Sequence, residues 1–375
     1  MKIRRSRQRG AVAALALAAV ALAGCGGAAA DTSPDESEQA AEPNGSGTDT
    51  HVLVDLAGRE VEVPTEVTNV AALVGPSFET VAMVGGTEQT VLRYGPATTN
   101  EVWAHWQQRV FPENDVPAYD NAREPNIEEL LALDVEVVLY WDWTEIQDSL
   151  DQAGMPSIVL QVTTDDGIDT AEEFVEFKQQ EILVVGELYG GEALTEAQEW
   201  ADYVEEKVAM ITERTSQLSN EERPSVYFVR GPEALVTHGG ESYTRYVVDI
   251  AGGNLVTRDD PELMYTTTME QVLQWDPEYI FMGHQQSTDV IVDDPAWDPV
   301  QAVVNDQVYV NFGSTGNAEY QTTATLLMTQ IATILHPELF SDIDMVAEVQ
   351  EYYSRFFEVE LTDEEAEAML QHGIP

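Results

Sequence analysis

Residues 127–140 read Ile-Glu-Glu-Leu-Leu-Ala-Leu-Asp-Val-Glu-Val-Val-Leu-Tyr, and residues 269–282 repeat the pattern without a gap as Met-Glu-Gln-Val-Leu-Gln-Trp-Asp-Pro-Glu-Tyr-Ile-Phe-Met. Each copy has the apolar spacing of a short helix, then an Asp at a break, then an apolar run typical of a buried parallel strand. The identical pairs are Glu128/Glu270, Leu131/Leu273, Asp134/Asp276 and Glu136/Glu278. The repeat predicts two lobes of similar build. The alternative is that two unrelated helix–strand units share the pattern by chance.

The first 50 residues have the pattern of an export signal and a tether. Basic residues at positions 2, 4, 5, 7 and 9 precede an apolar run at 11–23. As a helix this run would span about 20 Å, less than the ~30 Å hydrocarbon core of a bilayer, which favours a signal peptide at 1–24. The run ends in Leu22-Ala23-Gly24-Cys25, which resembles the lipobox of bacterial lipoproteins. We therefore expect Cys25 to carry a lipid that anchors the protein to the cell membrane, and residues 25–50 to include a disordered tether, because 26–50 contain no large apolar side chain.

The charge balance excludes one class of partner. The chain has 17 Lys and Arg against 68 Asp and Glu, and its formal net charge is −51. A surface of this sign repels phosphate backbones, so we expect no nucleic-acid partner. The acidic residues are dispersed, which is typical of a solvated surface in a saline environment, where repulsion is screened within ~3 Å at 1 M salt. Cys25 is the only cysteine, so neither an intrachain disulfide nor a Cys-based metal site can form.

Residues 51–375 are more than one core usually holds, and they predict two domains. The alternation of strand and helix patterns predicts an α/β fold with parallel sheets. The longest helical pattern, at 195–218, would span about 36 Å and lies midway between the two copies of the repeat. It is either an ordinary surface helix or a strut between lobes. We assign 51–192 to an N-terminal lobe, 193–219 to an interlobe helix, and 220–375 to a C-terminal lobe with closing helices.

From residue 51 to about 337 the chain resembles the substrate-binding proteins of ABC importers for iron–siderophore complexes, haem or vitamin B12. The resemblance lies in the order of several short segments, at 54–61, 125–133, 250–254, 268–273 and 297–310. It implies two Rossmann-like lobes joined by one long helix, with a ligand in the cleft between them. It also implies that one Glu on each lobe docks onto arginines of the membrane permease, at positions that match Glu128 and Glu270. The alternative is that each Glu only helps its helix to begin.

Ligands of open parallel sheets bind beyond the carboxyl ends of the strands, and this rule selects the candidate ligand-binding residues. They are Arg93, Tyr94, Trp141 and Trp143 in the first lobe, and Arg230, Tyr243, His284 and Phe312 in the second. Aromatic rings stack on flat or apolar ligands, and arginine pairs with the oxygens of a ferric complex. Core packing is the alternative for each aromatic residue, and a surface ion pair is the alternative for Arg230. Weaker candidates are Trp103, Trp106 and Tyr320.

We expect a binding protein and not an enzyme, because the sequence lacks a nucleophile elbow, a zinc-protease motif, a phosphate loop and a dinucleotide fingerprint. Of the histidines, only His105, His238 and His284 lie near predicted cleft loops, and none has a recognisable spacing partner for a bare metal ion. The expected protein is a monomer without a cofactor that captures a ferric siderophore or related metal chelate outside the cytoplasm and delivers it to an ABC permease. The alternatives are haem or cobalamin binding in the same role, an exported hydrolase, and a tethered ligand sensor. Contact of His284 with a chelated metal also stays open.

Overall fold

The computed structural model describes residues 49–75, 77–95, 101–112, 115–161, 168–284, 287–313 and 316–375. Cys25, the expected signal peptide and nearly all of the expected tether lie outside these residues. Residues Thr48–Pro375 form one compact unit. Within the described ranges, no helix has both the length and the apolar composition needed to cross a bilayer.

Both copies of the repeat fold in the same way. Residues of the first copy form helix α3 (Ile127–Ala132) and strand β6 (Val137–Trp141), and those of the second form α8 (Met269–Trp275) and β12 (Tyr279–Met282). The shared Asp lies between helix and strand with a left-handed backbone, at φ 51° in Asp134 and φ 45° in Asp276. Aspartate tolerates this conformation better than most residues, which accounts for its presence at both breaks.

The first sheet is wholly parallel and has the strand order β5-β4-β3-β6-β7. An antiparallel hairpin precedes it, formed by β1 (Thr50–Val54) and β2 (Glu60–Pro64). The other strands are β3 (Val70–Ala72), β4 (Thr90–Tyr94), β5 (Ala118–Tyr119) and β7 (Ser157–Gln161). The other helical segments of this lobe are α1 (Ser77–Met83), η1 (Gly86–Gln89), α2 (Glu101–Val110) and α4 (Thr144–Gln152).

The second sheet is mixed, and in this detail it departs from the expectation of parallel sheets. Its order is β11-β9-β8-β12-β13, and β10 also pairs with β8. Strands β8, β10, β12 and β13 are parallel, whereas β9 pairs antiparallel with β8 and β11. The remaining strands are β8 (Ser225–Val229), β9 (Val236–His238), β10 (Asn254–Leu255), β11 (Met264–Thr266) and β13 (Val308–Val310). The helical segments are η3 (Asn220–Glu222), α7 (Tyr243–Ile250), α9 (Asp289–Val292), α10 (Gln301–Val304), η4 (Ala318–Tyr320) and α11 (Ala324–Leu335).

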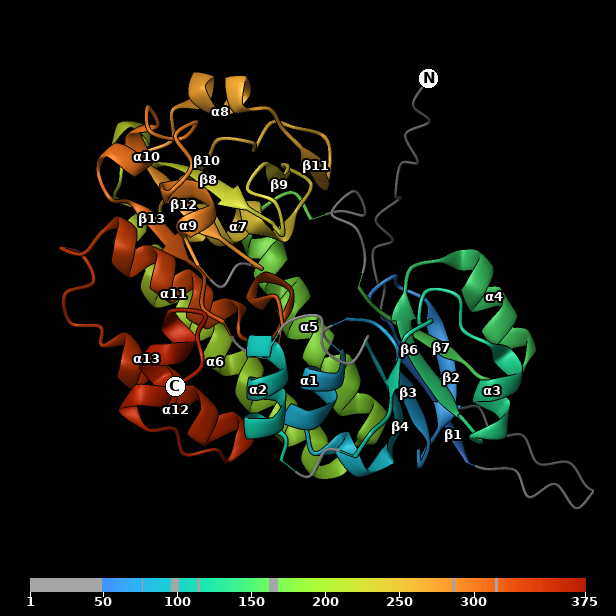
Figure 1. Ribbon diagram of the computed structural model, residues 1–375. Helices are drawn as coiled ribbons and strands as arrows, with labels where there is room; N and C mark the ends of the chain where they lie inside the picture. Colours follow the sequence, from blue (N-terminus) through green and yellow to red (C-terminus); the bar gives the residue numbers. More distant parts are fainter. Residues whose placement is uncertain are drawn as a thin grey trace, which may run out of the picture. The chain divides into compact units, whose positions relative to one another are not determined.

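The long helix between the lobes is present, but it has an antiparallel companion that the sequence analysis omitted. Helix α6 (Gly191–Thr215) begins four residues before the predicted pattern, and α5 (Ala171–Tyr189) runs beside it (Figure 1). The turn between them is Gly190-Gly191, with φ of 65° and 55°. A Cβ on Gly186 would lie 2.5 Å from the Cβ of Ala197, so glycine permits the close contact of the two helices.

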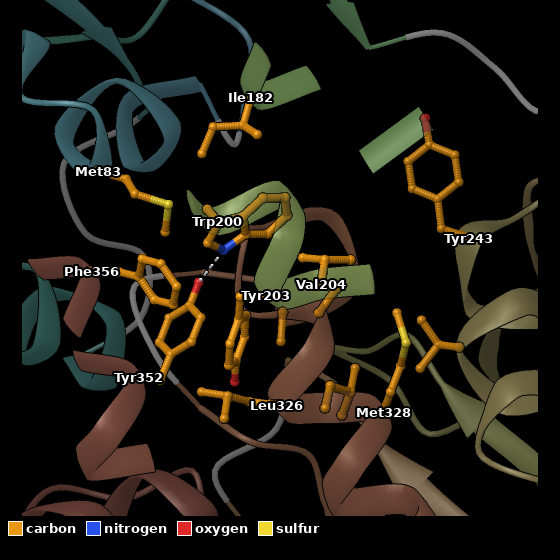
Figure 2. Packing of buried hydrophobic residues seen from close by; sticks show 14 of the residues in the cluster. Met83, Ile182, Trp200, Tyr203, Val204, Tyr243, Leu326, Met328, Tyr352 and Phe356 are labelled. Atoms are coloured by element: carbon orange, nitrogen blue, oxygen red, sulfur yellow. Dashed lines mark hydrogen bonds between the residues drawn. The ribbon is translucent and has the colours of Figure 1, made fainter. Parts of the chain in front are cut away.

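The largest apolar core is shared by the two lobes. It runs from the first sheet through α5 and α6 to α11 and the C-terminal helices α12 (Met345–Phe357) and α13 (Asp363–Leu370). Figure 2 shows its centre, where the indole Nε1 of Trp200 donates to the hydroxyl of Tyr352 at 3.2 Å. A smaller cluster belongs to each lobe alone. The two sheets are therefore built separately and held on a common helical core, and the boundaries assigned to the lobes stay a prediction.

Candidate ligand-binding site

Three predicted aromatic residues of the first lobe come together at the carboxyl ends of β4 and β6. The rings of Tyr94 and Trp141 meet edge to face with centroids 5.4 Å apart, and Trp141 stacks on Trp143 at 4.8 Å. The indole Nε1 of Trp141 donates to Oε1 of Gln161 at the end of β7, at 3.0 Å. Trp143 is 38% exposed, and the guanidinium of Arg123 lies 5.9 Å from its ring centroid.

Arg93 also lies at the end of β4, but its half-buried side chain lies beside Val116 and Phe78 instead of joining the aromatic stack. Its Nε donates to the carbonyl oxygen of Val116 at 3.2 Å, and its guanidinium lies 5.6 Å from the ring centroid of Phe78. Burial lowers the pKa of Arg93. No carboxylate among the described residues forms an ion pair with Arg93, so its charge has no fixed acidic partner there.

Arg230 directly follows β8 and brings a positive charge to the carboxyl edge of the second sheet. Glu319, on η4, is buried, and burial raises the pKa of its carboxyl group, although the charge of Arg230 opposes that shift. His238 at the end of β9 is also buried, and burial, then Arg230, lower its pKa well below the usual value. Its Nδ1 lies 2.6 Å from the hydroxyl of Thr244 and its Nε2 lies 3.2 Å from the hydroxyl of Tyr320. Arg230 is thus surrounded by groups that favour their neutral forms.

His284 directly follows Gly283 at the end of β12 and contacts the first lobe. Its ring centroid lies 4.5 Å from that of Trp103 on α2, so this weaker candidate lies beside a predicted site residue. Burial, followed by the charges of Arg230 and His372, lowers the pKa of His284 to about 4. The imidazole is therefore neutral at pH 7 and offers one N–H donor and one lone pair.

Tyr243 and Phe312 lie in the apolar core. Tyr243 is buried against Phe174, Phe177 and Tyr320, with ring centroids 5.4 to 5.5 Å away. Phe312 is buried, and its backbone N–H donates to Oε1 of Gln330 at 2.7 Å. These surroundings give both rings a packing role, and their contact with a ligand stays a prediction, as do the ligand contacts of the other candidates.

Three polar residues at this edge were not predicted from the sequence: Glu319, Asn311 and His372. All three are buried, and His372 is close enough to His284 to affect its pKa. Nothing in the sequence points to His372, because it lies 62 positions after the end of β13 and reaches the edge only through tertiary packing. Across the described part of the chain, no group of three or more His, Cys, Asp or Glu side chains could hold a metal ion.

Glu128 and Glu270 lie on equivalent short helices and are both exposed. Each helix precedes a parallel strand, so its first turn lies at the carboxyl edge of the sheet. Other side chains cap these helices: Asn126 accepts from the N–H of Glu128, and Thr268 accepts from the N–H of Gln271. The two glutamates are therefore not the N-caps of their helices.

Leu131 and Leu273 follow these glutamates by three residues, which places each on the same helix face as its Glu. They are 48% and 41% exposed, a large value for two identical apolar residues of a repeat. A recess of about 340 Å³ lies beside α8 and is lined by Asp260, Tyr265, Thr267, Thr268, Gln271 and Trp275. Both lobes therefore present an acidic and an apolar side chain together.

Comparisons with known proteins identify the fold and the family. Residues 70–311 match the family model described as periplasmic binding protein. The chain is 22% identical over 331 residues to the molybdate-binding protein MolA of Haemophilus influenzae, covering 82% of this chain and 90% of the relative. The solved structure of MolA bound to molybdate has a TM-score of 0.71 at 20% identity, covering 83% of this chain and 99% of that one.

Two further solved structures are similar. A periplasmic solute-binding protein from Veillonella parvula has a TM-score of 0.72 at 21% identity, covering 86% of this chain and 97% of that one. CeuE of Helicobacter pylori, in a complex with Ni-His, has a TM-score of 0.66 at 19% identity, covering 86% and 99%. Since the family model spans well over half of the chain, the protein belongs to the periplasmic binding protein family and is a binding protein, not an enzyme.

Proposed function

We propose that the protein captures an anionic, oxygen-rich metal complex between the carboxyl edges of its two sheets, and that a ferric siderophore is the first candidate. The observation that carries this proposal is the surroundings of Arg230. Its acidic neighbour Glu319 is buried with a raised pKa, and its histidine neighbours have lowered pKa values. None of the ion pairs among the described residues involves Arg230, so its guanidinium is available to an anionic ligand, with which it forms strong charge-assisted hydrogen bonds.

The aromatic stack of the first lobe supports a chelate with flat faces. Trp143 is 38% exposed, Trp141 stacks on it, and the guanidinium of Arg123 lies 5.9 Å from its ring centroid. Ferric catecholate complexes combine aromatic faces with negatively charged oxygens, a combination that suits stacking and Arg pairing together. Haem and cobalamin, which are also flat, are alternatives in the same role.

A small oxyanion is the second candidate ligand. The carboxyl edge of the second sheet has three buried polar residues, Asn311, Glu319 and His372. Buried polar groups suit a compact ligand that is fully enclosed. The relative MolA is a molybdate-binding protein. A small oxyanion would use the second edge alone, whereas a chelate would also need the aromatic stack of the first lobe.

Binding to a panel of ligands tests the proposal. The purified protein is titrated with a ferric catecholate, a ferric trihydroxamate, haem, cyanocobalamin and sodium molybdate, with Trp fluorescence and thermal unfolding as readouts. A ligand at 100 times its Kd stabilises the folded protein by about 2.7 kcal/mol, which raises Tm by several degrees. Stabilisation by a ferric complex supports the first candidate, and by molybdate the second. A protein that responds to none of the five contradicts both.

We propose further that Glu128 and Glu270 contact basic side chains of the permease. Their exposure and the independent capping of both helices support this role. The flanking Leu131 and Leu273 add apolar area, and the recess beside α8, with Asp260 in its wall, suits the entry of a basic side chain. Attachment of a lipid at Cys25 is likewise proposed; replacing Cys25 by Ala should move the protein from the detergent phase to the aqueous phase in a phase-partition assay.

A further inference from the structure

The C-terminal segment, defined as α13 and residues 371–375, lies against the carboxyl edge of the second sheet. The N–H of Gly313, shortly after β13, donates to the carbonyl oxygen of Met369 at 2.7 Å, and Nε2 of Gln330 donates to that of Leu370 at 2.9 Å. A Cβ on Gly313 would lie 2.6 Å from Cγ of His372. Glycine at this position therefore allows the imidazole of His372 to lie directly against the backbone.

Helix α2 of the first lobe also contacts this segment, through Trp106 and Arg109. The indole Nε1 of buried Trp106 donates to the carbonyl oxygen of Gly373 at 3.0 Å. The guanidinium of Arg109 donates to both carboxylate oxygens of Glu365, at 2.6 and 3.3 Å, and to the carbonyl oxygen of Glu360 at 2.6 Å. The end of the chain is thus fixed by residues of both lobes.

His372 is buried without a satisfied ring nitrogen. It is 2% exposed, and neither Nδ1 nor Nε2 has a hydrogen-bond partner among the described residues. Burial lowers its pKa to about 4, and the nearby backbone of Asn311 acts in the opposite direction. Buried Asn311 likewise has no partner for either side-chain amide atom in the described ranges.

Unsatisfied groups of this kind point to a ligand. A buried polar group without a partner costs roughly 1–3 kcal/mol, so such groups gather where a bound molecule completes their hydrogen bonds. Here they lie beside His284, which contacts Trp103 across the two lobes. At pH 7 the two imidazoles are neutral, so each can donate one N–H.

We propose that His372 is a ligand-contacting residue, which α2 holds in place through Trp106 and Arg109, and that it donates a hydrogen bond to an oxygen of an anionic ligand. Neutral N–H donors from His372 and Asn311 then surround a ligand whose charge is met by Arg230. This inference rests on the proposed capture of an oxygen-rich anion. It adds to the proposed ligand site the C-terminal segment, which lies far from the repeat in sequence.

Isothermal titration with sodium molybdate and with a ferric catecholate complex tests it. His372→Phe keeps a ring of similar size without a donor and should weaken binding of the recognised probe at least tenfold. His372→Gln keeps a donor and should retain most of the affinity, which a purely structural role does not predict. The matched control is His51→Phe on β1, which should leave Kd unchanged. If His372→Phe fails to fold by circular dichroism, His372→Ala replaces it.

The support from α2 is tested separately. Arg109→Met removes the pair with Glu365 and should weaken binding about threefold or more. Arg214→Met removes a comparable two-oxygen pair, with Asp342, at the end of α6 and should not change Kd. An unchanged Kd in His372→Phe overturns this inference alone. Failure of the wild-type protein to bind either probe overturns it together with the proposed function.

Discussion

Glu136 and Glu278, identical residues of the repeat, bind the start of a neighbouring strand in the same way. Oε2 of Glu136 accepts from the N–H and the hydroxyl of Thr68, at 2.7 and 3.0 Å, just before β3. Oε2 of Glu278 accepts from the N–H and the hydroxyl of Ser225, at 2.8 and 3.2 Å, at the first residue of β8. The repeat therefore holds structural glutamates as well as exposed ones.

We expect Glu136→Ala and Glu278→Ala each to lower the free energy of unfolding by about 1.5–3 kcal/mol, because each removes hydrogen bonds between a carboxylate and a strand terminus. Urea unfolding followed by circular dichroism measures this loss, and ligand affinity should not change. Glu206→Ala, at an exposed site on α6, is the control and should have little effect. Equal stability of all three variants would show that the shared contacts contribute nothing.

The sequence predicted those elements whose apolar periodicity matches the face that they bury in the folded protein. The helix, break and strand of each repeat are confirmed, because their apolar residues follow the periods of the elements that they form. Helix α5 was missed because it packs on several sides and carries Lys178 and Glu181, a pair that suggests a surface. In the structure these two side chains are buried and form an ion pair at 2.5 Å, and Lys178 also donates to the carbonyl oxygen of Tyr320.

The candidate site was predictable only where it follows a strand. The rule that ligands bind beyond the carboxyl ends of parallel strands selected Tyr94, Trp141 and Trp143, and the structure shows that these three rings contact one another in series. The rule cannot tell whether a residue after a strand points toward solvent or into the core, and Phe312 lies in the core. It also cannot reach His372, whose position depends on contacts of α13 with both lobes.

Trp143→Ala should weaken binding of a ferric chelate roughly 2- to 12-fold, since an aromatic contact contributes about 0.5–1.5 kcal/mol and 1.36 kcal/mol corresponds to a factor of ten. Fluorescence titration measures the change. Leu194→Ala on α6 removes an apolar side chain that is equally exposed, at 38%, and is the control. If the ligand is a small oxyanion held by the second edge alone, Trp143→Ala leaves Kd unchanged.

Arg230→Met should reduce affinity about 10- to 160-fold for either class of anion, because a hydrogen bond to a charged group contributes about 1.5–3 kcal/mol and 1.36 kcal/mol corresponds to a factor of ten. The unbranched side chain of methionine keeps part of the packing of the arginine stem, so thermal unfolding should be little affected. Calorimetric titration measures the affinity of Arg230→Met. Arg258→Met, which changes an arginine paired with Asp249, is the control for a general loss of positive charge. Equal affinity of both variants would remove Arg230 from the ligand site.

Glu128→Arg and Glu270→Arg should abolish ligand uptake by cells that carry the matching permease, and leave Kd intact, because each reverses the charge of a proposed docking residue. Leu131→Ser and Leu273→Ser should reduce the rate of uptake only in part. Glu129→Arg changes an adjacent exposed carboxylate and should transport normally. A variant of Glu128 that loses ligand affinity along with uptake would contradict the docking role.

Stability should depend on pH in two separate windows. The pKa values of His284 and His372 are lowered from 6.5 to about 4, so the unfolded chain binds more protons between these values and stability falls as pH is lowered from 6.5 to 4. The hydrogen bond from Arg109 is the main cause that lowers the pKa of Glu365 from 4.5 to about 2. The stability that ionised Glu365 contributes is complete above pH 4.5 and is lost as pH falls toward 2.

Thermal unfolding at pH values from 7 to 2.5 measures both windows. We expect His372→Phe to flatten the dependence of Tm between pH 6.5 and 4 while leaving the lower window unchanged. Glu365→Gln should do the reverse, because its amide cannot titrate and still fills the position beside Arg109. An identical decline in wild type and both variants would mean that other groups govern the acid response. A flattening of the lower window by His372→Phe would show that the C-terminal segment opens as one unit when either contact is lost.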